Sequence, residues 1–119
     1  MLIKKGRTIV CDAETTSNFF TKFLGLMFRK STNGLLMKFT FNSIERRGIW
    51  MPFMRFPIDI VYIDSKKSVA GLVERAPPMT LNPRTWKVFY PEKPAKYILE
   101  LPAGAAKKAG LEMGDVLEF

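Results

Sequence analysis

The sequence predicts an α+β fold: a mainly antiparallel, small barrel-like sheet with one main helix at about residues 14–25 and a short C-terminal helix at about 103–109. About seven or eight short β-prone runs recur along the chain, and one apolar stripe has helical spacing. The length of 119 residues, 47% of them hydrophobic, suffices to bury the core of one domain. We therefore expect a single domain over residues 1–119.

The first elements are predicted to be a hairpin followed by the main helix. Leu2–Ala13 contains two β-prone runs on either side of Gly6, where glycine can turn the chain. Asp12 then offers an N-cap for a helix, and Gly25 a place for that helix to end. Between them begins an apolar series at i, i+1, i+4, i+5 and i+8, the pattern of one helical face: Phe19, Phe20, Phe23, Leu24 and Met27.

The rest of the chain predicts further short strands and one short helix. Ile58–Ile63 is apolar on both faces apart from Asp59, which is typical of a central strand covered on both sides. Ala103–Ala109 predicts a short helix that stops at Gly110. Prolines interrupt regular structure across residues 76–84. The other predicted strands are 35–39, 47–51, 68–74, 85–90, 97–101 and 116–119.

The absence of histidine limits the chemistry that this chain can perform. It excludes Ser-His-Asp and Cys-His catalysis, histidine metal ligation and imidazole titration near neutral pH. The sequence also has no glycine-rich phosphate loop, nucleophile elbow or calcium-loop spacing. Cys11 is the single cysteine, so we interpret it as a small packing residue rather than a reactive thiol. We accordingly predict no catalytic residue, no metal site and no cofactor.

The basic charge of the chain is concentrated in its first half. The net charge is +8, and residues 1–60 carry ten basic and four acidic side chains, against nine and seven in residues 61–119. The basic residues are scattered in pairs, without the block of like charges that is typical of a nucleic-acid arm. A solvated basic surface is the simpler interpretation. An anionic ligand or a nucleic acid is the alternative.

The sequence predicts a cytoplasmic protein. Asp12 and Glu14 interrupt the N-terminal apolar stretch before a signal-peptide core could form, and no run of about 18 uncharged apolar residues exists. A lone cysteine also fits a reducing compartment. A leader removed before this sequence begins is the alternative, and the oligomeric state is left open.

The segment Ile49–Asp59 is the first candidate for a ligand site. Trp50, Phe53 and Phe56, together with two methionines, Met51 and Met54, could line an apolar pocket. Arg55 and Asp59 could supply its polar contacts. The structural alternative is a plug of core side chains that closes one end of the barrel.

Asp59 is the residue whose burial would cost the most. It shares a strand face with Val61 and Ile63, and an unpaired buried carboxylate would cost several kcal/mol. We therefore expect either a structural partner or a bound ligand. The structural partner could be a backbone N–H group or a two-point ion pair with one of three arginines: Arg29, Arg47 or Arg55.

Glu100 is the one candidate for a second carboxylate beside Asp59. It alternates with Ile98, so its side chain either lies on the outer surface or joins Asp59. Two carboxylates in one cleft could act as acid and base in glycoside cleavage, provided that about 5–9.5 Å separates them.

The order and spacing of several motifs resemble the bacterial and archaeal family called domain of unknown function 192. The resemblance covers about residues 11–119 and rests on Gly25-Leu26-Met27-Phe28-Arg29, Gly34-Leu35-Leu36-Met37-Lys38-Phe39, Trp50-Met51, Pro57-Ile58-Asp59-Ile60-Val61-Tyr62-Ile63-Asp64, Tyr97-Ile98-Leu99-Glu100-Leu101, Gly104, Gly110 and Gly114-Asp115. It implies a compact, mainly β domain without an established activity. Many members carry a secretory or lipoprotein leader.

The resemblance also identifies residues that recur in the family, and two places where this chain departs from it. The recurrent residues map onto Arg29, Trp50, Met51, Asp59, Glu100 and Gly104. Pro52-Phe53 stands where members usually have a polar pair, and Arg55 where threonine is common. The resemblance therefore implies a pocket that is more apolar and more basic here than in other members.

Three hypotheses for the function follow. The favoured one is a non-catalytic binding module for a small or oligomeric ligand, an anionic one among the options, with seven candidate residues: Arg29, Trp50, Met51, Phe53, Arg55, Asp59 and Glu100. The second is a carboxylate-dependent hydrolase that uses Asp59 and Glu100. The third is nucleic-acid binding through the basic N-terminal surface.

Overall fold

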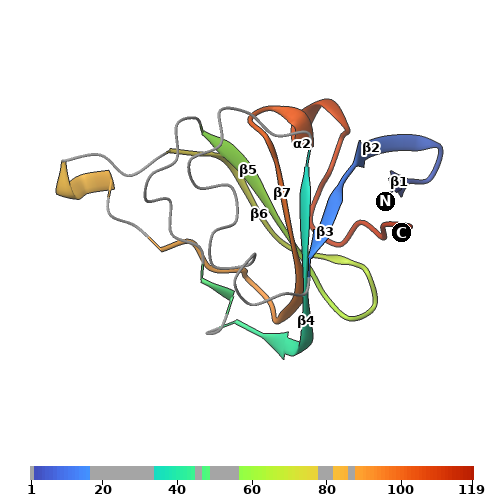
Figure 1. Cartoon of the computed structure of the whole chain (residues 1–119), viewed down its shortest axis with the longest axis horizontal. Helices are drawn as coiled ribbons and strands as arrows, with labels where there is room; N and C mark the ends of the chain where they lie inside the picture. Colours follow the sequence, from blue (N-terminus) through green and yellow to red (C-terminus); the bar gives the residue numbers. More distant parts are fainter. Residues whose placement is uncertain (1, 17–33, 45–46, 49–56, 78–81, 86–87) are drawn as a thin grey trace.

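The computed structural model describes the chain except for residues 1, 17–33, 45–46, 49–56, 78–81 and 86–87 (Figure 1). The described ranges contain strands and two short helical segments, in the order β1 (Leu2–Lys5), β2 (Thr8–Asp12), β3 (Glu14–Thr16), β4 (Leu35–Ser43), β5 (Ile58–Ile63), β6 (Val69–Ala76), the 3₁₀ helix η2 (Pro83–Thr85), β7 (Ala95–Pro102) and α2 (Ala105–Lys108).

A five-stranded sheet and a two-stranded sheet organise these elements. The larger sheet has the order β3-β4-β7-β5-β6, in which β3 and β4 are parallel and the other neighbours are antiparallel. β1 and β2 form a separate antiparallel hairpin. The predicted mainly antiparallel sheet is therefore confirmed, and helix in the described residues is limited to short segments.

The larger sheet is buried on both faces around β5, because this strand carries apolar residues at successive positions. Side chains alternate between the faces of a strand, so Ile58, Ile60 and Tyr62 of β5 join one apolar cluster while Val61 and Ile63 join another. All six residues of β5 are buried. This confirms the prediction of a strand covered on both sides at residues 58–63.

The β1–β2 hairpin, α2 and the C-terminal segment pack over one face of the large sheet. Ile3 of the hairpin, Ala106 of α2 and Leu117 near the end of the chain belong to the same apolar cluster as Val61. Figure 1 shows the hairpin and both chain ends on one side of β4 and β7. We call this the hairpin face of the sheet, and the other the Tyr62 face.

Three local predictions are confirmed, two of them near the ends of the chain and one in its middle. The hairpin turns at Gly6, whose φ of 58° lies in the left-handed region that glycine adopts readily. β6 pairs antiparallel with β5, as the predicted second hairpin requires. The short C-terminal helix is present as Ala105–Lys108 and is followed by Gly110. None of the helices in the described ranges has the length and apolar character needed to cross a bilayer.

Several other predictions are wrong or lie outside the described residues. The predicted main helix does not begin at residue 14, because Glu14–Thr16 pairs with β4 as a strand; residues 17–25 lie outside the described ranges. Asp12 ends β2 and does not cap a helix. In the predicted strand 47–51, Arg47 is not in a strand and residues 49–51 are not described. In the predicted strand 85–90, Thr85 belongs to η2 and residues 86–87 are not described.

The C-terminal strand and the barrel are also not found in the described chain. Residues 116–119 make isolated bridges, between Lys4 and Glu118 and between Ser68 and Val116, so they form no continuous strand. The described sheet is open, since β3 and β6 are its two outer strands and are not paired with each other. The mainly antiparallel prediction therefore holds, whereas the described sheet does not close into the predicted barrel-like arrangement.

Lys5 and Asp115 tie the hairpin to the C-terminal segment. The Lys5 ammonium lies 2.8 Å from the Asp115 carboxylate and also donates to the carbonyl of Gly110. The backbone N–H of Glu112 donates to the same carboxylate at 2.7 Å. These contacts favour the charged carboxylate and hold the pKa of Asp115 below its ordinary value of 3.8, with the Lys5 hydrogen bond as the largest cause.

We predict that Lys5→Ala raises the pKa of Asp115 toward 3.8. Because the folded-state pKa is lowered, this contact stabilises the protein above pH 3.8 and ceases to do so as the pH falls through the folded-state value. An NMR titration of the Asp115 carboxyl carbon measures the shift. Lys4→Ala is the matched control on the same strand and should leave the titration unchanged; an unchanged titration in Lys5→Ala would contradict the assignment.

Candidate functional site

Asp59 is fully buried, and both of its carboxylate oxygens accept hydrogen bonds from backbone N–H groups. Oδ1 accepts from Arg75 of β6 at 2.8 Å, and Oδ2 accepts from Ala106 of α2 at 2.9 Å. Hydrogen bonds to an ionised group are worth about 1.5–3 kcal/mol each. The carboxylate that the sequence predicted to need a partner is therefore held by the main chain.

The bond to Arg75 belongs to a β-bulge in the β5–β6 pair. Ile58 pairs with Ala76 and Ile60 pairs with Val73, so two residues of β6 stand opposite Asp59. Arg75 has a φ of 53°, a left-handed conformation that costs a non-glycine residue on the order of 1–3 kcal/mol. The bulge turns the N–H group of Arg75 out of the β-ladder, and this group donates to the Asp59 carboxylate. The hydrogen bond offsets the cost of the left-handed conformation.

The bond to Ala106 fixes the start of α2. The first N–H groups of a helix have no partner within the helix, and the N-cap residue Gly104 supplies no side-chain acceptor. Asp59 provides that acceptor from the neighbouring strand. The Arg75 side chain also lies close over Gly104, since a Cβ there would meet its guanidinium at 3.2 Å. Asp59 thus joins β5, the β6 bulge and α2 at one point.

The arginine partners predicted for Asp59 are not found among the described residues. Arg47 donates from Nε to the carbonyl of Ala95 at 3.0 Å and from a terminal nitrogen to the carbonyl of Phe41, and its guanidinium stacks 3.8 Å above the Phe39 ring. Phe39 packs against the cluster on the Tyr62 face, opposite to Asp59. Arg29 and Arg55 lie outside the described residues.

Glu100 lies on the opposite face of the sheet from Asp59. In the antiparallel β5–β7 register, Asp59 stands opposite Leu101 and Ile60 stands opposite Glu100. Directly opposed residues project to the same face, and successive residues to opposite faces. The two carboxylates therefore do not share a cleft, and the predicted acid and base pair is wrong.

Glu100 instead lies in the buried surroundings of Tyr62. Its side chain is 5% exposed, on the face that carries Ile60 and Tyr62. The Tyr62 hydroxyl donates to the carbonyl of Phe89 at 2.6 Å. Burial raises the pKa of Tyr62 well above its ordinary value, and the nearby Glu100 carboxylate raises it further. Tyr62 is accordingly a neutral hydrogen-bond donor at physiological pH.

The aromatic pocket predicted from the sequence falls on residues that the structure does not describe. Trp50, Met51, Phe53 and Arg55 all lie within 49–56, and Arg29 lies within 17–33. Of the seven candidate site residues, the structure therefore places Asp59 and Glu100, and it does not bring these two together.

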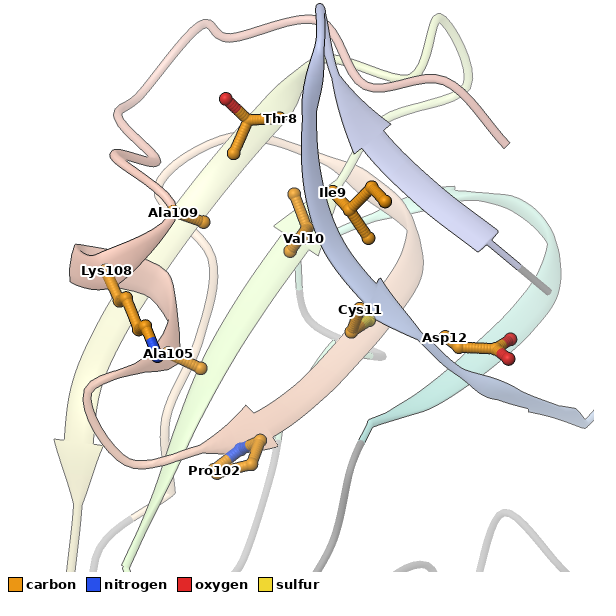
Figure 2. Close-up of a pocket in the computed structure, with 9 residues that line it drawn as sticks. All are labelled: Thr8, Ile9, Val10, Cys11, Asp12, Pro102, Ala105, Lys108 and Ala109. Carbon is orange, nitrogen blue, oxygen red and sulfur yellow. The ribbon is translucent and has the colours of Figure 1, made fainter.

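An open groove of about 640 Å³ lies between the hairpin and α2 (Figure 2). Ligand sites commonly have volumes of about 300–1,000 Å³. We call it the β2–α2 groove and define it by the residues that line it: Thr8, Ile9, Val10, Cys11, Asp12, Pro102, Ala105, Lys108 and Ala109.

The α2 wall of the groove is one face of a helical turn with small side chains. Ala105, Lys108 and Ala109 are spaced at i, i+3 and i+4, which places them on one side of the turn. The two alanines leave room beside the turn, and Lys108 contributes an exposed cation. Ala106 faces away from the groove and carries the bond to Asp59. Asp59 therefore positions this wall from behind.

Cys11 lines the groove as a packing residue. Its sulfur lies so close to Gly34 that a Cβ there would meet it at 3.0 Å, and the side chain packs against the hairpin-face cluster. Burial raises the pKa of the thiol to about 11, and the neighbouring Asp12 carboxylate acts in the same direction. This agrees with the interpretation of Cys11 as an unreactive thiol.

The residues that line the groove do not stand out as a site in the sequence. The run Thr8–Asp12 has the composition of an ordinary hairpin strand, and alanines at i and i+4 carry no chemical signal. The 58% exposure of the Ile9 side chain becomes visible only in the structure.

Comparisons with known protein families point to an uncharacterised group. The family model DUF192, described as "Uncharacterized ACR", matches residues 1–119. A UPF0127 protein of Pyrococcus furiosus is 33% identical over 117 residues, which span 98% of this chain and 94% of that protein. A UPF0127 protein of Thermococcus sibiricus is also 33% identical, over all of this chain and 74% of its own length.

Two solved structures have a similar fold. A protein of unknown function from Novosphingobium aromaticivorans aligns over 99% of this chain and 84% of its own with a TM-score of 0.83 and 21% identity. A Sinorhizobium meliloti protein, provisionally described as a transcription regulator, aligns over 89% of this chain and 79% of its own with a TM-score of 0.77 and 28% identity. At 21% identity the first of these likenesses shows the fold alone.

We predict that Asp59→Asn lowers the free energy of unfolding by about 2–3 kcal/mol, because the amide keeps one acceptor and turns its NH₂ group toward the other buried N–H donor. Urea denaturation followed by circular dichroism measures the change. Asp64→Asn is the matched control: a single oxygen of that carboxylate accepts the N–H groups of Lys66 and Ser68 at 2.9 Å, so an amide oxygen can keep both bonds. Equal losses in the two variants would refute the role of Asp59.

We also predict that Cys11 reacts with iodoacetamide slowly at neutral pH. Its rate should rise by about tenfold per pH unit up to pH 10, because the thiolate is the nucleophile and the pKa is about 11. Asp12→Asn removes a neighbouring negative charge and should lower the pKa. A rate that levels off near pH 9.0, the ordinary thiol value, would show that the thiol is not desolvated.

Proposed function

This chain belongs to the DUF192 family of uncharacterised proteins, and we propose that it is a non-catalytic binding domain whose ligand lies in the β2–α2 groove. The observation that carries the proposal is the groove itself, an open space of about 640 Å³ with one fixed wall and one exposed cation. We propose further that the ligand carries negative charge, in keeping with Lys108 and the net charge of +8.

The construction of the α2 wall supports a binding role. A four-residue helix is marginal by itself, but the Asp59 carboxylate and the packing of Ala106 hold it in place. A ligand that meets a fixed wall does not lose binding free energy to ordering that wall. The fixed α2 wall therefore favours ligand binding.

The arrangement of the carboxylates argues against the hydrolase hypothesis. A glycoside hydrolase needs two carboxyl groups on the two sides of one bond, whereas Asp59 and Glu100 project to opposite faces of the sheet. Both oxygens of Asp59 also accept backbone hydrogen bonds, so proton transfer by this group would break the contacts that hold α2.

The aromatic and methionine segment stays in the proposal as a second part of the binding surface. We keep Trp50, Met51, Phe53 and Arg55, with Arg29, as predicted contacts, on the grounds of their composition. The last of these predicted contacts, Arg55, precedes Asp59 by four residues in the sequence. Asp59 is proposed as a positioning residue for the site rather than a ligand contact.

Nucleic-acid binding is the second candidate function, favoured by one observation. The Sinorhizobium meliloti neighbour is provisionally described as a transcription regulator, and a chain of net charge +8 would be attracted to phosphates. The same NMR sample can test both candidate functions, because each predicts that a different probe shifts the amide signals: small carboxylates for the groove and a DNA duplex for nucleic-acid binding.

The test is chemical-shift perturbation of the ¹⁵N-labelled protein by small carboxylates, with benzoate and hexanoate as probes. We expect the amides of Thr8–Asp12 and of Ala105–Ala109 to shift together as the probe is added, because they border the groove. A control with neutral benzamide should give smaller shifts, since it lacks the charge that Lys108 would meet.

Two outcomes would overturn the proposal. If no amide of the groove responds to either carboxylate, nor to the peptide described below, the groove is not a ligand site. If a DNA duplex at low salt shifts a different set of amides while the carboxylates shift none, nucleic-acid binding replaces the proposed function.

A further inference from the structure

The β2–α2 groove is bordered by the edge of a strand rather than by one face of it. Successive side chains of a strand point to opposite faces, so a groove that met a single face would be lined by every second residue. The β2 side of this groove is lined by five consecutive residues, Thr8 to Asp12. The main chain of β2 therefore runs along the groove.

The edge of β2 that faces α2 has no strand beside it in the described chain. β2 pairs with β1 on one side, in a sheet of two strands. Figure 2 shows β2 between β1 and the α2 turn, with the lining side chains on both walls. An edge strand presents backbone N–H and C=O groups that can pair with another chain.

One of the two outer strands of the large sheet, β6, differs from β2 because loop segments bond to its edge. The backbone of β6 is met at Ala70 by the N–H of Lys93, and at Val69 by the N–H of Gly114 and the carbonyl of Asp115. Loop segments thus cover part of the β6 edge. In the described chain none of these loop bonds meets Thr8–Cys11 of β2, so the β2 edge leaves room for an added strand.

From this geometry we propose that the ligand is an extended acidic peptide segment that pairs along the edge of β2, with a carboxylate beside Lys108. The inference rests on the proposed function, and it names the ligand class for the same groove. Main-chain hydrogen bonds to β2 would supply affinity, and side chains that point toward α2 would supply specificity.

The size and charge of the groove both fit this ligand. The five residues of β2 extend over roughly 17 Å, which matches a peptide of about the same number of residues. Lys108 is the one cation among the residues that line the groove. The carboxylate of Asp12 points away from α2 in Figure 2, so it does not face the peptide across the groove.

Charge also favours a peptide over a second copy of this chain as the added strand. Two chains with a net charge of +8 repel each other, whereas an acidic segment is attracted. Sedimentation of the protein alone therefore serves as one arm of the test, and a dimer that forms through β2 would overturn the proposal.

The probe is a capped peptide of five residues that alternates glutamate and valine, titrated into the ¹⁵N-labelled protein. We expect the largest amide shifts in Thr8–Asp12 and Ala105–Ala109. A peptide with the same side chains but N-methylated backbone amides keeps the charge and loses the main-chain donors. It should bind about tenfold more weakly or not at all, because pairing with a strand edge requires those donors.

Two variants separate the contribution of Lys108 from a general effect of charge. Lys108→Glu should weaken binding of the glutamate peptide by about threefold to tenfold, because it reverses the charge on the groove wall. Lys107→Glu makes the same change of charge on the adjacent position of α2, which is also exposed but does not line the groove. It should have a smaller effect, and the melting temperatures of both variants confirm that they are folded.

The outcomes distinguish this inference from the proposed function. If benzoate or hexanoate binds in the groove while neither peptide does, the binding function stands and the peptide inference is wrong. If the N-methylated peptide binds as well as its parent, the main-chain edge is not used and the inference is likewise wrong. If Lys107→Glu and Lys108→Glu weaken binding of the glutamate peptide equally, the effect is one of nonspecific charge. That result would overturn the position assigned to the peptide carboxylate beside Lys108.

Discussion

The structure depends on one buried carboxylate that accepts hydrogen bonds from two distant parts of the main chain. Asp59 holds the N–H of Arg75 at 2.8 Å and that of Ala106 at 2.9 Å. A buried charge without such bonds would be costly, and the bulged backbone of Arg75 and the four-residue α2 would lack partners without Asp59. The carboxylate and the two N–H groups supply one another with hydrogen-bond partners. The β5 strand, the β6 bulge and α2 therefore form one unit.

This unit divides the described chain into two chemical environments. On the Tyr62 face, Glu100 and Tyr62 are buried in the apolar cluster, and burial keeps the Tyr62 hydroxyl neutral. On the hairpin face, Asp59 fixes α2, and α2 with the β2 edge forms the open groove. The carboxylates that could have formed a catalytic pair are separated by the sheet. The β2–α2 groove on the hairpin face is the surface on which the proposed binding function rests.

The sequence predicted those features that depend on a residue's own chemistry or on a long apolar run. Ile58–Ile63 was identifiable from its continuous apolar character, and Asp59 from the cost of burying it. The partners of Asp59 are backbone groups, which every residue carries and which therefore leave no mark in a sequence. The face of Glu100 depends on the register with β5, and a slip of one residue would reverse it. The groove escaped prediction because its walls are alanines and an ordinary hairpin strand.

The most direct test of this account is amide hydrogen exchange at Arg75 and Ala106, followed residue by residue by NMR. If the Asp59 carboxylate joins the bulge and α2 to the core, both amides should exchange as slowly as those of β5 and β7, since all of them would be released only by global unfolding. If they exchange as fast as the amide of Lys66, which donates to Asp64 in an exposed turn, the carboxylate does not hold these elements in place and the central claim is wrong.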